Sequence, residues 1–150
     1  MLITSYGTII HAQVETIWKL LLDRVENPRS YQPRILESRV QERFSDGVVR
    51  EMRIDDMLIR ERITIDDGAL LIHAELLEHP QYLGIIDTRV LPRAVQNPTA
   101  PVNLDINVRL ELKEDHREGL VKPEANLEAA ILEELDTIRQ KAEELEKRVV

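Results

Sequence analysis

Two charged side chains of opposite sign fall, by their spacing, on the apolar face of a predicted β-hairpin. If Asp55 and Asp56 form a two-residue turn, Arg50 lies directly opposite Glu61. Directly opposed residues have Cβ atoms about 5 Å apart, which is close enough for an ion pair. The other residues on this face are Met52, Ile54, Met57, Ile59, Ile63 and Ile65. A charge pair on such a face indicates either a structural salt bridge or a polar contact for a ligand in an apolar pocket.

A third carboxylate, that of Glu42, joins the pair in one of two registers. A three-residue loop over 45–47 suits a bulged hairpin turn with glycine last, because glycine adopts positive φ at little cost. That loop places Phe44 opposite Val48 and Glu42 opposite Arg50. If the Asp-Gly pair alone forms the turn, Glu42 leaves the cluster, because a slip of one residue turns every side chain to the other face. Both registers stay open on the sequence alone.

The next turn extends the apolar face to a further strand. The segment "DDG" at 66–68 is a turn signal, and it places Ile65 opposite Leu70 and Ile63 opposite Ile72. Apolar residues of the last strand and the last helix complete the predicted wall of a cavity. The expected ligand-binding residues are Arg50, Glu61, Glu42, Met52, Ile59, Ile63, Ile72, Ile106, Leu110, Ile131, Leu135 and Ile138. We assign no catalytic residue.

The spacing of apolar residues predicts the elements that position this site. The order is strand, helix, short helix, six strands, long helix. Residues 2–10 form the first strand, and the helix from Val14 ends at Pro28. The six strands are expected at 36–44, 48–54, 57–65, 69–79, 81–91 and 102–112. The long helix, of about 26 residues, begins at Pro123, because proline suits the first helical position.

The last predicted strand has the clearest alternation in the chain. Its apolar residues, which share one face, are Val102, Leu104, Ile106, Val108, Leu110 and Leu112. One dry and one wet face indicate an antiparallel sheet that is covered on one side. The apolar stripe of the long helix can supply that cover, and coiled-coil association is the alternative use of the stripe. We therefore expect an α+β fold in one domain, residues 1–150.

Composition and charge exclude several classes of partner. Of the 150 residues, 43% are hydrophobic, which is enough for a buried core. Acidic residues outnumber basic ones by 28 to 20, and the formal net charge of −8 disfavours nucleic acid as a partner. No apolar run reaches the length of a membrane span, and the N-terminal segment lacks a secretion signal. The chain has no cysteine, which excludes disulfides and thiolate sites and fits a cytoplasmic protein.

Neither a metal nor a cofactor is expected from the sequence. The four histidines are His11, His73, His79 and His116, and none has a partner at metal-ligand spacing. His73 falls on the outer face of its strand, so we expect it to be exposed. No glycine-rich phosphate loop or nucleophile motif occurs.

Three further features have ordinary structural interpretations beside functional ones. Trp18 either lines the mouth of the cavity or packs in the core. Tyr31 can offer a hydroxyl group to a ligand, although its loop allows exposure. The charged run at 133–148, which includes Glu134, is typical of a solvated helix face with weak ion pairs.

Three short segments resemble a known family. They are "IWKLLLDRVENPRSYQPRI" at 17–35, "VVREM" at 48–52 and "IRERITI" at 59–65. With them the chain resembles the AtaL-like family of the START/SRPBCC superfamily, whose helix-grip fold is that of the birch-pollen allergen. The resemblance implies a curved antiparallel seven-stranded sheet that wraps around the long C-terminal helix, with two short helices after strand 1 and a cavity between sheet and helix. It implies no established reaction.

The leading functional hypothesis is the binding of a small, largely apolar ligand, such as a lipid or a secondary metabolite, between the sheet and the C-terminal helix. The alternative is a cyclase or dehydratase in which Glu61 is a general acid or base. A third hypothesis is an interaction protein that uses the acidic C-terminal helix. Either a monomer or a homodimer fits these hypotheses.

Overall fold

The computed structural model describes residues 2–92, 101–113 and 123–148. Its elements, in chain order, are β1 (Leu2–Ile10), α1 (Val14–Glu26), the 3₁₀ helix η1 (Pro28–Ser30), β2 (Ile35–Phe44), β3 (Gly47–Ile54), β4 (Met57–Asp66), β5 (Leu71–Glu78), β6 (Tyr82–Pro92), β7 (Val102–Leu112) and α2 (Pro123–Arg148). The predicted order of elements is confirmed.

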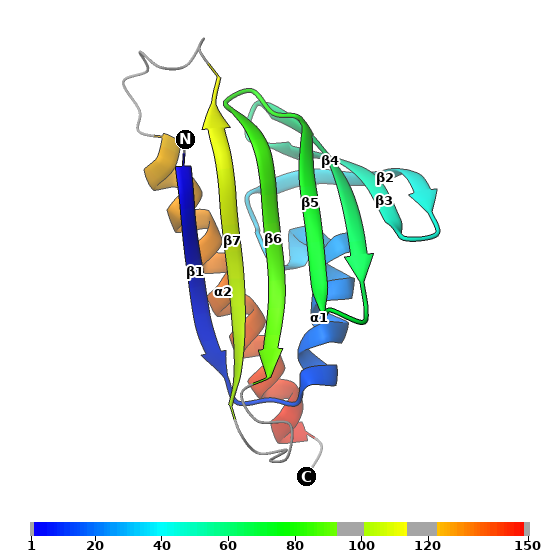
Figure 1. Cartoon of the computed structure of the whole chain (residues 1–150), viewed down its shortest axis with the longest axis vertical. Coiled ribbons are helices and arrows are strands. Elements are labelled where there is room, and N and C mark those ends of the chain that lie inside the picture. Colours follow the sequence, from blue (N-terminus) through cyan, green and yellow to red (C-terminus); the bar gives the residue numbers. More distant parts are fainter. Residues whose placement is uncertain (1, 93–100, 114–122, 149–150) are drawn as a thin grey trace.

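The strands form one seven-stranded antiparallel sheet in the order β1-β7-β6-β5-β4-β3-β2. Each strand after β2 pairs with its predecessor, and β1 closes onto β7. Figure 1 shows the sheet curving around α2, with α1 beside the lower half of that helix. The predicted fold class is confirmed: an α+β helix-grip arrangement with a helix and a short 3₁₀ turn after strand 1.

The core lies between the concave face of the sheet and the two helices. The even-numbered residues of β7 from Val102 to Leu110 are buried, as their alternation predicts. The stripe of α2 that packs into the same core consists of Ile131, Leu135, Ile138 and Ala142. Because this stripe is buried within the chain, α2 covers the sheet rather than forming a coiled coil.

The β3–β4 hairpin has the predicted register. Ile54 pairs with Met57, and Arg50 lies directly opposite Glu61. The turn residue Asp55 has φ 53°, a left-handed conformation that aspartate tolerates better than most residues. This two-residue turn holds the two charged side chains on the concave face.

The β2–β3 register differs from both predicted alternatives. Phe44 pairs with Gly47 across a two-residue turn, and this turn sets Glu42 opposite Val49. An irregularity between Glu42 and Val40, farther from the turn, then brings Val40 opposite Arg50. Glu42 is therefore exposed and does not lie beside Arg50. Gly47 is required for close approach rather than for positive φ, because a Cβ there would collide with the backbone of β4.

The β4–β5 turn is longer than predicted. Ile65 pairs with Ile72 and Ile63 with Ala74, so the pairing is shifted by two residues from the expected one. A shift of two keeps every side chain on its predicted face, since the side-chain period of a strand is two. Ile63 and Ile72 accordingly remain on the concave side, where both are buried.

Candidate functional site

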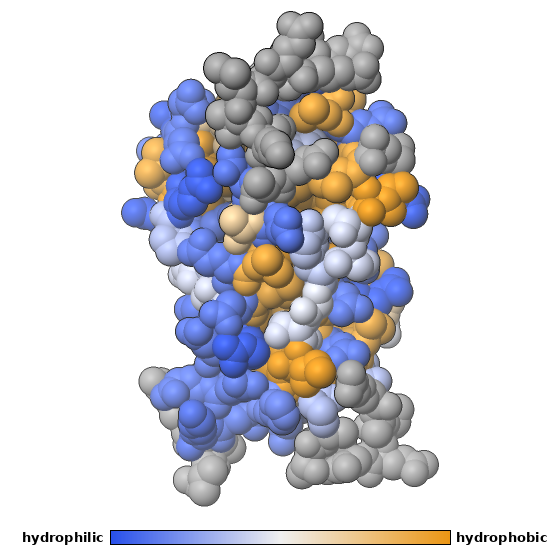
Figure 2. Space-filling model, turned by 90° about the vertical axis from the view of Figure 1, so that its left-hand side faces the viewer, coloured by the Kyte–Doolittle hydropathy of each residue, from blue (hydrophilic) through white to orange (hydrophobic). Residues whose placement is uncertain are grey.

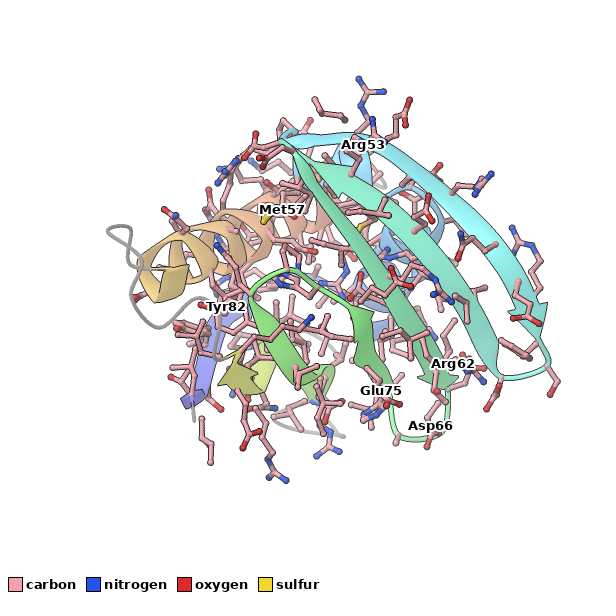
Figure 3. The ribbon with its side chains drawn as sticks, turned by 90° about the horizontal axis from the view of Figure 1, so that it is seen from above. Arg53, Met57, Arg62, Asp66, Glu75 and Tyr82 are labelled. Carbon is pink, nitrogen blue, oxygen red and sulfur yellow. The ribbon has the colours of Figure 1, made fainter. Side chains whose placement is uncertain are left out.

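A cavity of about 340 Å³ lies between the concave face of the sheet, the end of α1 and the first half of α2. Most of its wall is aliphatic: Ile35, Met52, Ile54, Ile59, Ile63, Ile72, Ala74, Leu76, Ile86, Ile106, Leu110, Leu127 and Ile131. Figure 3 shows Met57 and Tyr82, which also line it, on the side of the sheet next to α2 and Glu75 on the outer side. Its size falls in the range of small-molecule sites, which span about 300–1,000 Å³.

Arg50 joins β3 to β4 and to the end of α1. Its Nε and Nη2 donate to Oε1 of Glu61 at 3.3 and 3.2 Å. Its Nη1 donates to the backbone oxygens of Arg24 and Val25, both at 3.0 Å. These are carbonyl groups of the last turn of α1, which have no partner within the helix. Arg50 therefore caps the negative end of α1 while it neutralises Glu61.

Arg24 makes a second ion pair on the same wall. Its Nη1 lies 3.1 Å from Oε1 of Glu134 on α2, and its Nη2 donates to the hydroxyl of Thr88 on β6 at 2.9 Å. Arg24 is 8% exposed, and the other two side chains also line the cavity. α1, α2 and β6 are thus tied together at one point of the wall.

We call Arg24, Arg50, Glu61, Thr88 and Glu134 the polar cluster. Its two guanidinium groups and two carboxylates balance in charge, and the members all line one cavity whose wall is mostly aliphatic apart from its mouth. A buried ion pair gains little net stability over an apolar replacement, so its presence is weak evidence of a stabilising role alone. The cluster can offer oriented hydrogen bonds to a polar group inside an apolar space.

The mouth of the cavity is polar. It is formed by the β3–β4 turn, the β5–β6 turn, the segment after η1 and the start of α2, through Gln32, Arg34, Asp55, Asp56, His79, Gln81 and Asn126. Arg34 and Asp55 form an ion pair at 2.7 Å. Nδ1 of His79 accepts the backbone N–H groups of Gln81 and Tyr82, which leaves the ring proton on Nε2.

The structure brings most of the predicted site residues to one place. Those that line the cavity are Arg50, Glu61, Met52, Ile59, Ile63, Ile72, Ile106, Leu110 and Ile131. Leu135 and Ile138 are buried in the core but do not line it. Glu42 is exposed on β2 and is not part of the wall, because of the register described above.

Sequence reasoning missed three of the five members of the polar cluster: Arg24, Thr88 and Glu134. Glu134 was interpreted as part of a solvated face, yet it is partly buried against Arg24. The missing signal was helical spacing: Arg24 follows the core residue Leu21 by three positions, and Glu134 follows Ile131 by three. This is the same signal, a charge in register with apolar residues, that identified Glu61.

Tyr31 and Trp18 have structural contacts. Tyr31 is fully buried, contrary to the exposure that its loop allows, and its hydroxyl donates to Asp23 at 2.8 Å. Burial, together with this hydrogen bond, raises the pKa of the Tyr31 phenol well above its usual value of 10.0. Trp18 packs against the core at its edge and donates its indole N–H to Asp67 at 3.0 Å.

The described residues offer few candidates for a metal site or for a membrane span. Over residues 2–92, 101–113 and 123–148, no group of three histidine or acidic side chains is arranged to hold a metal ion. His73 is partly exposed beside Asp87, and His116 lies outside the described residues. Among the described helices, none is both long and apolar enough to cross a membrane.

Comparisons with known proteins show the fold. No family model and no curated protein matches this sequence. The structure is similar to that of the protein XoxI from Bacillus cereus, with a TM-score of 0.73 and 18% identity over 97% of this chain and 99% of that one. It is similar to the Zhui aromatase/cyclase from Streptomyces sp. R1128, with a TM-score of 0.73 and 17% identity over 99% and 96% of the two chains.

A third similar structure is larger. The di-domain ARO/CYC StfQ of the steffimycin biosynthetic pathway matches with a TM-score of 0.71 and 18% identity over 97% of this chain, which covers 46% of that protein. At these identities the likeness concerns the backbone arrangement, while function depends on the residues of the site. The chain has the helix-grip fold that these proteins share.

Proposed function

We propose that this protein binds one small, largely apolar molecule in the cavity between its sheet and α2. The observation that supports this most strongly is the polar cluster, a charge-balanced group of side chains set into an aliphatic wall. Pockets for small molecules have this composition: they are mostly apolar, with a few polar groups that orient the ligand. The AtaL-like resemblance of the sequence agrees with the proposal, and membership of that family stays a prediction, as do a cytoplasmic location and the oligomeric state.

The apolar wall supplies the affinity in this proposal. Burial of apolar surface contributes about 25 cal/mol per Å², so a ligand that buries roughly 200 Å² gains about 5 kcal/mol before the costs of association. The wall consists of branched aliphatic and methionine side chains, among which Met52 and Met57 can adapt to different shapes. The ligand is therefore expected to be selected by volume and by its polar group.

Native mass spectrometry of the freshly purified protein tests whether a small molecule co-purifies with it. A thermal-shift screen of apolar metabolites follows, because a ligand at a hundredfold excess over its Kd stabilises the fold by about 2.7 kcal/mol. Ala74→Phe fills the cavity from β5 and should abolish the shift. Ala129→Phe, at an exposed position of α2, is the matched control and should leave it unchanged. Equal shifts in the two variants would place the binding site elsewhere.

The second candidate is a cyclase- or dehydratase-type enzyme with Glu61 as a general acid or base. The two hydrogen bonds that Glu61 accepts from Arg50 both go to its Oε1. Glu61 is 6% exposed, and its Oε2 has no hydrogen-bond partner among the described residues. Glu61→Gln separates the candidates, since a binding protein loses affinity mildly and an enzyme loses turnover. If Glu61→Leu stabilises the fold and alters no binding, Glu61 takes part in neither ligand binding nor catalysis.

The surface gives less support to an interaction protein. Figure 2 shows that apolar residues on the side of the molecule where β1 and α2 lie form separate patches among polar ones. Leu132 and Leu145 of α2 are exposed, and single exposed leucines are common on protein surfaces. The binding of a small molecule is therefore the function that the geometry supports best.

A further inference from the structure

We infer that the ligand of this cavity ends in an uncharged hydrogen-bond donor, that is, an alcohol or a phenol rather than a carboxylate, a phosphate or an amine. This inference rests on the proposed function and makes it more specific. It follows from three properties of the wall: its balanced charge, the acceptor oxygens that remain on it, and the charge around its mouth.

Charge balance disfavours any ionised head group. Arg50 pairs with Glu61, and Arg24 pairs with Glu134, so the polar cluster has no net charge to offer. The Arg50 pair is held further by two backbone carbonyl groups, which cannot be exchanged for a ligand without uncapping α1. An ionised ligand would add an uncompensated charge in an apolar cavity, where such a charge is strongly disfavoured.

The hydrogen bonds that remain open favour a donor. Glu61 accepts through Oε1 alone, and Glu134 likewise contacts Arg24 through Oε1. The second oxygen of each carboxylate accepts no hydrogen bond from a described residue, and each can accept from a ligand hydroxyl group. An ether or ketone oxygen cannot satisfy these acceptors, because it has no proton to donate.

The charged residues around the mouth of the cavity also disfavour anionic ligands. Asp55 and Asp56 stand at the opening, and Arg34 beside them is paired with Asp55. The whole chain has a formal net charge of −8. A carboxylate or phosphate would thus approach through a negative potential, whereas a neutral molecule would not.

The volume limits the size of the ligand. The 340 Å³ lies near the lower end of the range for small-molecule sites, about 300–1,000 Å³. Linear C10 compounds that differ only in their head group are suitable probes of this space. 1-Decanol, its isomer methyl nonyl ether, decanoate and decylammonium separate donor, acceptor, negative and positive head groups.

Competition against a neutral fluorescent probe, N-phenyl-1-naphthylamine, measures these preferences at pH 7.5. We expect 1-decanol to displace the probe at least tenfold more effectively than each of the other three compounds. Equal or stronger displacement by decanoate, decylammonium or the ether would overturn the inference. If neither the probe nor any of the four compounds binds, the proposed function fails first, so the two failures are distinguishable.

A charge variant tests the cause. Glu134→Gln removes one carboxylate and leaves the cluster with a net positive charge, so decanoate should gain at least tenfold relative to 1-decanol. Glu133→Gln, an exposed neighbour on α2, makes the same change in total charge and should leave the ratio unchanged. Circular dichroism confirms that each variant is folded. An unchanged ratio in folded Glu134→Gln, or an equal change in Glu133→Gln, would show that the polar cluster does not read the head group.

Discussion

Replacement of Arg50 by methionine should destabilise the fold more than any other single change of charge in the cavity. The side chain is 9% exposed and makes four hydrogen bonds, two to Glu61 and two to the last turn of α1. Methionine fills a similar volume but leaves the Glu61 carboxylate without its partner. Loss of one partner of a buried ion pair costs about 3–5 kcal/mol.

The hydrogen bonds of Arg50 narrow the expected loss of stability. The two carbonyl groups of α1 also lose their donor, and water in the cavity can replace part of what both they and Glu61 lose. We expect a loss of about 4 kcal/mol in the free energy of unfolding. For a chain of this length that corresponds to a fall of roughly 8–16 °C in Tm.

Urea denaturation followed by circular dichroism measures this loss in a double-mutant cycle. Glu61→Leu should cost less than Arg50→Met, because Arg50 keeps its carbonyl partners. The double variant should cost about 2 kcal/mol or less, since it leaves no uncompensated charge and only the carbonyl groups unpaired. If Arg50→Met does not fold at 25 °C, recovery of a cooperative transition in the double variant still measures the coupling.

The exposed pair between Arg39 and Glu51 provides the control. Arg39 lies on β2 with its side chain 71% exposed, so Arg39→Met should change stability by less than about 0.5 kcal/mol. A cost below about 1 kcal/mol for Arg50→Met, or additive effects of the two cavity changes, would refute the view that Arg50 compensates both Glu61 and the end of α1.

Three further variants, one of them with a matched control, test the packing of the fold by urea denaturation. Tyr31→Phe removes the hydrogen bond to Asp23 and should cost about 1 kcal/mol. Because burial raises the pKa of Tyr31, wild-type stability is lost as pH rises above the usual tyrosine pKa of 10.0, and Tyr31→Phe should lose less there. Gly84→Ala should cost at least about 2 kcal/mol, since Gly84 has φ 134° and a Cβ would meet β7, whereas Gly68→Ala should be tolerated. Ile138→Ala should cost about 2–5 kcal/mol.

These predictions fail on distinct results. If the free energy of unfolding does not change with alkaline pH in either wild type or Tyr31→Phe, the Tyr31 phenol ionises normally in the folded protein. Equal effects at Gly84 and Gly68 would show that the close approach to β7 is not limiting. A negligible cost at Ile138 would contradict its place in the core.

The sequence by itself determined the order of the helices and strands and one of the two ion pairs of the polar cluster, that between Arg50 and Glu61. Alternation over residues 102–112 marks β7, and the Asp-Asp turn sets the register that opposes Arg50 and Glu61. Both signals are local: a strand has a period of two, and a two-residue turn leaves one pairing for the residues on either side. The predicted pairing across the β4–β5 turn was wrong by two residues, but an even shift leaves each side chain on its predicted face of the sheet.

Only the tertiary structure decided which other charges join them. The two-residue turn before Gly47 removed Glu42 from the cluster by setting it opposite Val49, and the sequence around this turn is compatible with more than one register. Arg24 and Glu134 are 110 positions apart in the sequence, and they meet because α1 and α2 pack on the same concave face. Helical spacing can place a charge on an inward face, but the partner of that charge is fixed only when the sheet curves and brings the helices together.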